Sequence, residues 1–288
     1  MKIAVTGARG LVGSRVLELL DKKHEFLPLS SQDIDIRERH SIDKFLKGKN
    51  IDVLIHMAAK TDVDGSEMEK DLGKESEVWN INVTGTRNIA EFCKENAVKL
   101  VHISTDFVFD GKKPVGEFYT EDDVPNPINF YAITKYEAEK AVEEAQGDFV
   151  ILRIAYPYRA HFEQKKDFVR AILDRLRQGL PIAGVEDHIM CPTFIDDAAF
   201  AIDSILEHNG SGIYHAVGSE DLSPYEAIMK IVEVFRLKKD LILKTTREEY
   251  FRGKARRPFN LSLKNGRIEE LGIRMKTFQE GLQELRNI

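Results

Sequence analysis

The sequence predicts an α/β fold built on a doubly wound parallel sheet, and three observations support this prediction. The first twenty residues read as an apolar strand, a glycine-rich turn and an amphipathic helix. Further strand-like apolar runs then alternate with helical segments at the spacing of a parallel sheet. Polar residues follow several of these runs, at the sheet edge where ligands of such folds bind. Together these features predict a Rossmann domain.

The turn in the first stretch, TGARGLVG, has glycines at the spacing of a dinucleotide-binding site. Gly7 would form the tight turn, Gly10 would let the backbone approach a pyrophosphate, and Gly13 would let the helix pack closely on the strand. The helix that begins near Leu11 would direct the free N–H groups of its first turn, including that of Val12, at the anion. A purely structural turn is the alternative.

The second strand-like run, residues 24–30, bears on which cofactor would bind. In dinucleotide folds an acidic residue at the end of the second strand binds the adenosine ribose. Here the run ends in Leu29, Ser30 and Ser31. With no carboxylate at this point and with Arg9 inside the glycine turn, a 2′-phosphate could be accommodated. We therefore expect NADP(H) rather than NAD(H), although Arg9 could equally be a solvent-facing charge.

A third strand-like run, residues 51–59, precedes a long segment with helical periodicity, Glu67 to Asn96. The apolar residues of this segment recur at spacings that predict a helix packed on the sheet. These residues are Leu72, Val78, Ile81, Val83, Ile89, Ala90 and Phe92. Trp79 is expected in the core or at its rim.

The next strand and the helix after it carry the candidate chemistry. The stretch VKLVHISTDFVFDG places Ser104, Thr105 and Asp106 at the carboxyl end of a strand, where ligands collect. In the later helix YAITKYEAEKAVEE, Tyr131 and Lys135 stand four residues apart and share a face. A nearby ammonium lowers the pKa of a phenol, as a proton donor to a carbonyl requires. A solvated helix face is the alternative for this pair alone, but its order after the glycine turn and the hydroxyl-bearing strand favours an oxidoreductase.

Composition excludes several classes of protein. The chain has 288 residues, 42% of them hydrophobic, and a formal net charge of -6 with no basic stripe, so nucleic acid is not expected as a partner. No run approaches about eighteen uninterrupted apolar residues, and the first strand leaves no room for a signal peptide, so we expect a cytoplasmic protein without a membrane partner. Cys93 and Cys191 lie far apart without metal-ligand spacing, which predicts reduced structural thiols and no metal site.

These motifs resemble the extended short-chain dehydrogenase/reductase superfamily, and within it the dTDP-4-dehydrorhamnose reductases. The similar stretches run through most of the chain: TGARGLVG, AAKTDVD, NINVTGTRNIAEFC, HISTDFVFDG, YAITKYEAE, CPTFIDDAA, GIYHAVG and ARRPFNLSLKNGRIEELGI. HISTDFVFDG followed by YxxxK is the most specific of them. The resemblance implies that Thr105, Tyr131 and Lys135 are catalytic, with Ser104 as the adjacent competitor for the hydroxyl role.

The resemblance also implies residues that bind the cofactor and the substrate. Asp35 and Ile36 would lie near the adenine, and Ala58 and Ala59 would line the cofactor after the third strand. A nucleotide-sugar substrate is implied, with Ser104, Thr105 and Asp106 facing it. Arg257 is a candidate for the substrate pyrophosphate, because a guanidinium fork matches phosphate; a surface charge is the alternative.

The chain departs from these reductases at two places where the substrate would be recognised. Lys60, which we count among the cofactor-binding residues, stands where they carry an aromatic residue. Tyr156, Pro157 and Tyr158 replace a Ser–Trp pair after the fifth strand. Because both places lie at the carboxyl edge of the sheet, we predict that Lys60 and the Tyr156–Tyr158 turn face one cleft and contact the sugar. The alternative is a solvated lysine and tyrosines that fill the core.

We expect a dinucleotide-binding domain formed by residues 1–155 and 190–215, and a smaller substrate-binding lobe formed by residues 156–189 and 216–288. The implied function is an NAD(P)H-dependent reductase of a nucleoside-diphospho-4-keto-6-deoxy sugar, as in dTDP-rhamnose biosynthesis. Two alternatives stay open: an epimerase or dehydratase that keeps NAD bound, and a non-catalytic regulatory subunit resembling the β subunit of methionine adenosyltransferase. A homodimer is a possible assembly.

Overall fold

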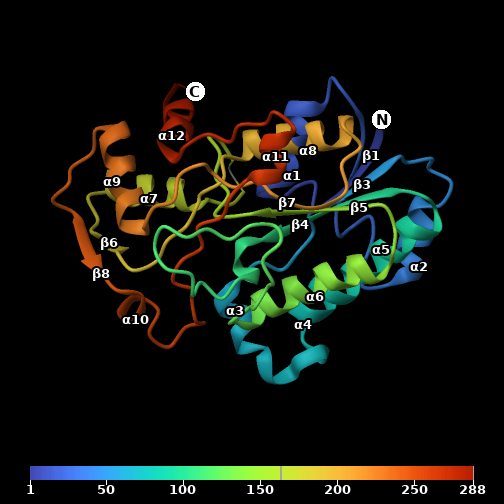
Figure 1. Ribbon diagram of the computed structural model, residues 1–288, viewed down its shortest axis with the longest axis horizontal. Coiled ribbons are helices and arrows are strands. Elements are labelled where there is room, and N and C mark those ends of the chain that lie inside the picture. Colours follow the sequence, from blue (N-terminus) through green and yellow to red (C-terminus); the bar gives the residue numbers. More distant parts are fainter. Residues whose placement is uncertain (163, 288) are drawn as a thin grey trace.

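The computed structural model describes residues 1–162 and 164–287, and within them the larger sheet has six parallel strands in the order β2-β1-β3-β4-β5-β7 (Figure 1). The strands are β1 Lys2–Thr6, β2 Glu25–Leu29, β3 Val53–His56, β4 Lys99–Thr105, β5 Phe149–Ile154 and β7 Gly212–His215. From β1 the chain first adds β2 on one side and then adds β3 and the later strands on the other side. The point between β1 and β3, where the order of the strands reverses, is where ligands of doubly wound sheets bind. The predicted fold class is confirmed.

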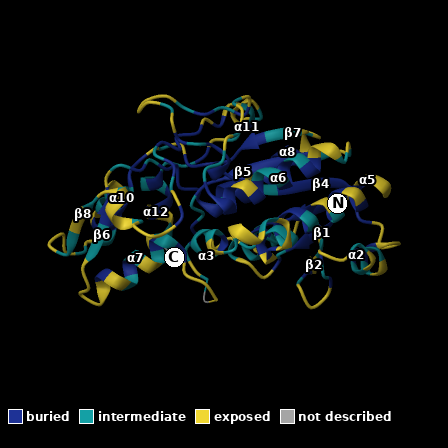
Figure 2. Cartoon of the chain, turned by 90° about the horizontal axis from the view of Figure 1, so that it is seen from below, coloured by how far each residue is buried: buried dark blue, intermediate teal, exposed yellow. Residues whose placement is uncertain are grey.

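Helices cover both faces of this sheet (Figure 1). On one face lie α1 Leu11–Leu20 and α8 Ile195–Glu207, and on the other α2 Arg39–Leu46, α5 Gly85–Glu95 and α6 Phe130–Glu144. The outer sides of these helices are exposed, while the strands between them are buried (Figure 2). None of the helices in the described parts of the chain is long and apolar enough to cross a membrane.

The two faces are built by the alternation of side chains along each strand. In β1, Ile3 and Val5 are fully buried in the core under α1 and α8, whereas Ala4 between them belongs to the core under α2 and α5. In β4, Val101 and Leu100 divide between the same two cores. A period of two with apolar residues on both faces is what a strand covered by helices on both sides requires.

A second, smaller sheet lies to the side of the first, beyond the carboxyl ends of its strands (Figure 1). It pairs β6 Ile182–Val185 with β8 Ile242–Thr245 in parallel. Around it lie α7 Phe168–Arg177, α9 Pro224–Phe235, α10 Arg247–Tyr250 and α12 Phe278–Asn287. The short helix α11 Gly266–Glu270 returns to the larger sheet beside β7. The division of the chain into two domains at the predicted boundaries stays a prediction.

The segment from Glu67 to Asn96 differs from the helix that its periodicity predicted. After α3 Val63–Met68 it forms a 3-10 helix, Lys70–Glu75, then α4 Glu77–Trp79, a π-helical turn, Asn80–Thr84, and finally α5. Gly73 interrupts the first part with a φ of 51°, and the Ser76 hydroxyl caps a new start by accepting from the Trp79 N–H. Leu72, expected in the core, is therefore 60% exposed.

A buried ion pair joins α6 to the larger sheet. Arg153 in β5 donates two hydrogen bonds to the carboxylate of Glu139 in α6, at 2.9 and 2.7 Å. Both side chains are almost fully buried, and the guanidinium carbon lies 5.1 Å from the centre of the Phe109 ring. Such a pair contributes little by itself, but the loss of one partner leaves a buried charge without compensation.

We therefore expect Glu139→Gln to lower the free energy of unfolding by about 3 kcal/mol. The matched control is Glu144→Gln in the same helix, whose carboxylate pairs with Arg87 at the surface and whose loss should change the stability by less than about 0.5 kcal/mol. Urea denaturation of the three proteins makes the comparison. Equal losses in the two variants would show that the buried pair has no special place in the fold.

Candidate active site

The glycine turn between β1 and α1 brings the backbone close to the next strand. Gly7 has a φ of 70°, and a Cβ at this residue would lie 2.8 Å from the Ala58 nitrogen. A Cβ on Gly13 would lie 2.4 Å from the Gly7 carbonyl oxygen. Both positions therefore require glycine. The turn has a cavity on each side, and Gly7, Gly10 and Ala59 line both cavities.

The first cavity, of about 650 Å³, extends from the glycine turn to the carboxyl ends of β4 and β5. Leu11 and Val12 line its near end. The three residues predicted to be catalytic line it together, with Ser104 and Asp106 beside them. The structure thus gathers side chains from β4, the turn after it and α6 at one edge of the sheet.

The second cavity, of about 700 Å³, lies on the other side of the turn, next to the end of β2. The predicted cofactor residues that line it are Gly7, Arg9, Gly10, Ser30, Asp35, Ile36, Ala58, Ala59 and Lys60. An elongated ligand whose pyrophosphate lies on the glycine turn would reach both cavities, as a dinucleotide does. The residues present therefore fit a dinucleotide.

The side chain of Lys135 in α6 is buried, and its ammonium group forms hydrogen bonds with residues of β4. The Nζ atom donates to the Ile103 carbonyl oxygen at 2.7 Å and lies 3.3 Å from Nε2 of His102. Burial lowers the pKa of Lys135 to about 8, although Glu139 on the same helix acts in the opposite direction. Lys135 can therefore exchange a proton close to neutral pH, as an exposed lysine cannot.

Two imidazole rings lie behind Lys135 on the neighbouring strands β3 and β4. The rings of His56 and His102 are 5.5 Å apart, and Thr6 Oγ1 lies 2.7 Å from His56 Nδ1. Burial lowers the pKa of His56 to about 3 and that of His102 well below its usual value, and the charge of Lys135 adds to both effects. Both rings are thus neutral. Because His102 Nε2 accepts from the ammonium, its Nδ1 carries the proton, and this atom has no hydrogen-bond partner among the described residues.

The phenol of Tyr131 does not behave as the YxxxK pattern predicted. Burial raises the pKa of Tyr131, Asp106 raises it further, and the Thr105 hydroxyl opposes them only in part. In the resting protein burial therefore shifts the pKa of the phenol upward, opposite to the direction that the YxxxK pattern predicted. The stabilisation of a Tyr131 phenolate by Lys135 stays a prediction. The phenol keeps its proton until a strong base develops beside it.

The end of β4 presents polar groups that are buried and incompletely paired. Thr105 Oγ1 donates to one oxygen of Asp106 at 3.0 Å. The other carboxyl oxygen of Asp106 and the Ser104 hydroxyl have no partner within the described residues. Burial raises the pKa of Asp106 to about 7. Buried polar groups without a partner are uncommon, and here both residues belong to the lining of the first cavity.

Tyr156 enters the first cavity after β5, in agreement with its predicted position. Its ring packs against Phe107 and Phe168, with centroids 6.1 and 5.9 Å apart. Tyr158 does not follow it, because the chain turns at Tyr156, which has a φ of 41°. The ring of Tyr158 is fully buried against Phe278 of α12. The expectation of a pocket-facing turn thus holds for Tyr156 and not for Tyr158.

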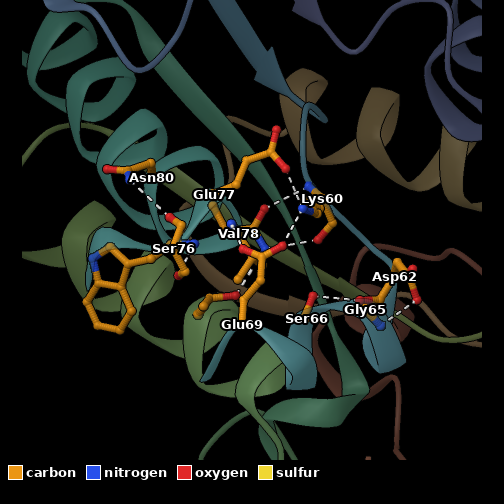
Figure 3. A network of polar contacts seen from close by, with 12 residues as sticks. Lys60, Asp62, Gly65, Ser66, Glu69, Ser76, Glu77, Val78 and Asn80 are labelled. Atoms are coloured by element: carbon orange, nitrogen blue, oxygen red, sulfur yellow. Dashed lines mark hydrogen bonds and ion pairs between the residues drawn. The ribbon is translucent and has the colours of Figure 1, made fainter. Parts of the chain in front are cut away.

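Lys60 lines the second cavity and Tyr156 the first, so the two do not face one cleft as predicted. The Lys60 ammonium pairs with Glu69 and Glu77, which lie on either side of the 3-10 helix (Figure 3). Glu69 also accepts from the Val78 N–H at 3.0 Å. Lys60 therefore links the segment around residues 69–78 to the end of β3 by ion pairs, and its ammonium is not free to contact a sugar.

The end of β2 contains a carboxylate that the sequence analysis did not assign there. Asp33 accepts from the Ser30 hydroxyl at 2.6 Å and from the Ser30 N–H at 2.8 Å. The Ser30 hydroxyl is the main cause of the lowered pKa of Asp33. Asp35, in the same loop, pairs with Arg37. The interpretation that this strand end lacks an acid is therefore corrected, because the turn after Ser30 folds Asp33 back onto it.

Arg257, the candidate for the substrate pyrophosphate, is engaged elsewhere. Its guanidinium pairs with Asp64 of α3 at 2.8 Å and lies over the ring of Phe251. Arg257 is not among the residues that line either cavity. Besides Lys135, the first cavity is lined by Lys165 and Lys166, which were not predicted as site residues. Their only sequence signal was a pair of positive charges before a helix, and such pairs are common on protein surfaces.

The strand order, the glycine turn after β1 and the Thr–Tyr–Lys set at the end of β4 and in α6 define a Rossmann-type protein of the NAD(P)-dependent oxidoreductase class. The family model described as the RmlD substrate binding domain matches residues 1–287, and the chain belongs to this family.

Individual relatives support the same placement. The dTDP-4-dehydrorhamnose reductase of Sinorhizobium fredii is 30% identical to the chain, over 99% of this chain and 96% of that protein. The crystal structure of the dTDP-4-dehydrorhamnose reductase of Bacillus anthracis in complex with NADP is 29% identical, with a TM-score of 0.90, and the match covers 99% of this chain and 98% of that one. Methionine adenosyltransferase 2 subunit beta of Mus musculus is 27% identical over 98% of this chain and 86% of that protein.

The burial of the Lys135 ammonium predicts how the stability of the wild type relative to Lys135→Met depends on pH. Because the folded-state pKa of about 8 lies below the ordinary lysine pKa of 10.5, the folded protein bears a penalty below pH 8 that disappears as the pH rises toward 10.5. From pH 7 to pH 10 the wild type should gain about 2 to 3 kcal/mol of stability relative to Lys135→Met. Denaturant melts at the two pH values measure this difference.

The control is Lys140→Met, since Lys140 is a half-exposed lysine of the same helix; its stability should follow that of the wild type at both pH values. If Lys135→Met also follows the wild type, the ammonium of Lys135 is not confined in the way the structure indicates.

Proposed function

We propose that the protein is a reductase that uses NADPH to reduce the 4-keto group of dTDP-4-dehydrorhamnose or a similar nucleoside-diphospho-4-keto-6-deoxy sugar. One observation carries the proposal: Thr105, Tyr131 and Lys135 line one cavity beside the glycine turn. The family of the chain and the names of its relatives in Sinorhizobium fredii and Bacillus anthracis support it.

A bound nicotinamide dinucleotide would supply the hydride for this reduction. The backbone at Gly7 and Gly10, with the first turn of α1, would hold its pyrophosphate. Tyr131 would donate a proton to the keto oxygen as negative charge develops there. Its raised pKa fits this role, because the phenol holds its proton in the resting site and releases it to the more basic alkoxide.

The other two residues would support Tyr131. The Thr105 hydroxyl would polarise the keto group by a hydrogen bond to the same oxygen. Lys135, with a pKa of about 8, carries its charge at neutral pH and would stabilise the phenolate that Tyr131 leaves behind. Lys165 would attract the diphosphate of the substrate, since it lines the same cavity and Arg257 does not; Lys166 beside it pairs with Asp174.

A non-catalytic role is the second candidate, because the relatives include a subunit of methionine adenosyltransferase. Likeness over the whole chain does not by itself separate a reductase from a binding subunit, since function depends on the site and not on the fold. The site here has a complete Thr–Tyr–Lys set and unpaired buried groups at the end of β4. These features favour the enzyme.

Tyr131→Phe tests the catalytic role. Loss of the phenolic proton should lower kcat for the NADPH-dependent reduction of dTDP-4-dehydrorhamnose by about 100-fold or more. The control is Tyr136→Phe in the same helix, because Tyr136 lies outside the cavity and its ring contacts Lys140; its kcat should stay within about twofold of the wild type. A wild-type protein that binds the cofactor but reduces no keto-sugar would support the regulatory role instead.

We further propose that NADP(H) is preferred over NAD(H), through Arg9. Arg9 and Ser30 line the second cavity together, where a 2′-phosphate of the adenosine ribose would lie. Asp33 opposes this phosphate, but its carboxylate is occupied by two hydrogen bonds from Ser30. A guanidinium can form two parallel hydrogen bonds with a phosphate, which outweighs repulsion by an exposed carboxylate.

Arg9→Ala should therefore raise the Kd for NADPH about tenfold and leave the Kd for NADH nearly unchanged. Isothermal titration calorimetry measures both constants. Arg87→Ala, an exposed arginine of α5 outside both cavities, serves as the control for a loss of surface charge. An equal loss for the two cofactors would exclude a contact between Arg9 and the 2′-phosphate.

A further inference from the structure

A contact between a phenol and an imidazole, separate from the Thr–Tyr–Lys set, lies at the first cavity. The hydroxyl of Tyr156 lies 2.8 Å from Nε2 of His188, and Nδ1 of His188 lies 2.8 Å from the Pro258 carbonyl oxygen. His188 is 1% exposed. Three loops thus meet here: the loop after β5, the loop after β6 and the C-terminal loop before α11.

The direction of both hydrogen bonds follows from the partners. A carbonyl oxygen can only accept, so Nδ1 of His188 carries a proton and donates it to Pro258. Burial, aided by Arg247 and Arg257, lowers the pKa of His188 to about 4, although the hydrogen bond to Pro258 and the charge of Asp187 act in the opposite direction. The ring is neutral, and its Nε2 offers a lone pair. The hydroxyl of Tyr156 must therefore donate to His188.

The ring of Tyr156 cannot easily turn away from this partner. It packs edge to face against Phe107 and Phe168, and these two rings also line the cavity. With its only proton committed to His188, the Tyr156 oxygen can offer the cavity lone pairs alone. It differs in this from Tyr131, whose proposed role is to donate.

We propose that Tyr156 determines substrate specificity by accepting a hydrogen bond from a hydroxyl group of the sugar, and that His188 is the positioning residue that fixes this polarity. The inference rests on the proposed function and deepens it. The cavity would hold one phenol that donates to the keto oxygen and one that accepts from a hydroxyl group on the same sugar ring. A substrate that presents only hydrogen-bond acceptors to Tyr156 would leave the Tyr156 oxygen without a partner, which is unfavourable in a buried site.

The test compares three probes: dTDP-4-dehydrorhamnose and its 2-deoxy and 3-deoxy analogues, each assayed with NADPH. In the wild type, one analogue should show a kcat/KM about tenfold lower than the parent sugar. Tyr156→Phe should reduce kcat/KM for the parent by the same factor, mainly through KM, and cause no further loss for that analogue. A loss in Tyr156→Phe that is equal for all three sugars, or no loss at all, would overturn the inference.

His188 is tested by two variants, because one of them could disturb the fold. His188→Leu removes the acceptor, frees the proton of Tyr156 and should reduce the discrimination between parent and analogue to about twofold. His188→Gln should keep the discrimination, since its amide oxygen can accept from the phenol while its NH₂ group donates to Pro258. In the double variant with Tyr156→Phe, His188→Leu should have no additional effect on the discrimination.

The outcomes separate this inference from the proposed function. If the wild type reduces the sugars but His188→Leu discriminates as well as the wild type, His188 does not fix the direction of the hydrogen bond at Tyr156. The proposed reductase function is unaffected by that result. A loss of discrimination in His188→Gln equal to that in His188→Leu has the same meaning. If the wild type reduces none of the three sugars, the proposed function fails and the inference fails with it.

Discussion

The hydrogen bond from the buried ammonium of Lys135 to the Ile103 carbonyl oxygen is the contact on which the arrangement of the site depends. It joins the middle of α6 to the end of β4, and these two elements carry the residues predicted to be catalytic. Because Tyr131 lies one helical turn before Lys135, fixing the lysine also places the phenol near Thr105. Burial is the largest cause of the raised pKa of Tyr131.

Burial of the Lys135 cation is unfavourable, and polar groups around it offset part of this effect. The neutral ring of His102 accepts from the ammonium on one side, and the carboxylate of Glu139 lies one helical turn further along α6. Glu139 is itself neutralised by Arg153 of β5. The polar groups thus form a chain from β3 through α6 to β5, buried between the sheet and the helix. Buried charge networks that shift a pKa are typical of functional sites.

The sequence predicted well what depends on local backbone chemistry and on the period of the strands. Gly7, Gly10, Thr105, Tyr131 and Lys135 could be placed because a glycine turn, a strand end and a helix face each fix a side chain relative to its own element. It predicted poorly what depends on contacts between distant segments. Asp64 engages Arg257, the 69–78 segment engages Lys60, and α12 covers Tyr158; none of these partners is signalled by local spacing. The direction of the Tyr131 pKa also depended on burial, which a sequence pattern does not reveal. His188 was missed because a lone histidine in a loop carries no signal until its two partners are seen.

An isotope experiment follows the transfer of a hydride from the cofactor to the sugar carbonyl. The protein is incubated with dTDP-4-dehydrorhamnose and NADPH that carries two deuterium atoms at C4 of the nicotinamide, and the product is examined by mass spectrometry and NMR. We expect one deuterium atom per product, located at C4 of the sugar, with one NADPH consumed for each. A sugar that is altered without deuterium and without consumption of NADPH would indicate an epimerase or dehydratase, and an unaltered sugar would indicate a protein that only binds; either result would rule out reduction by hydride transfer.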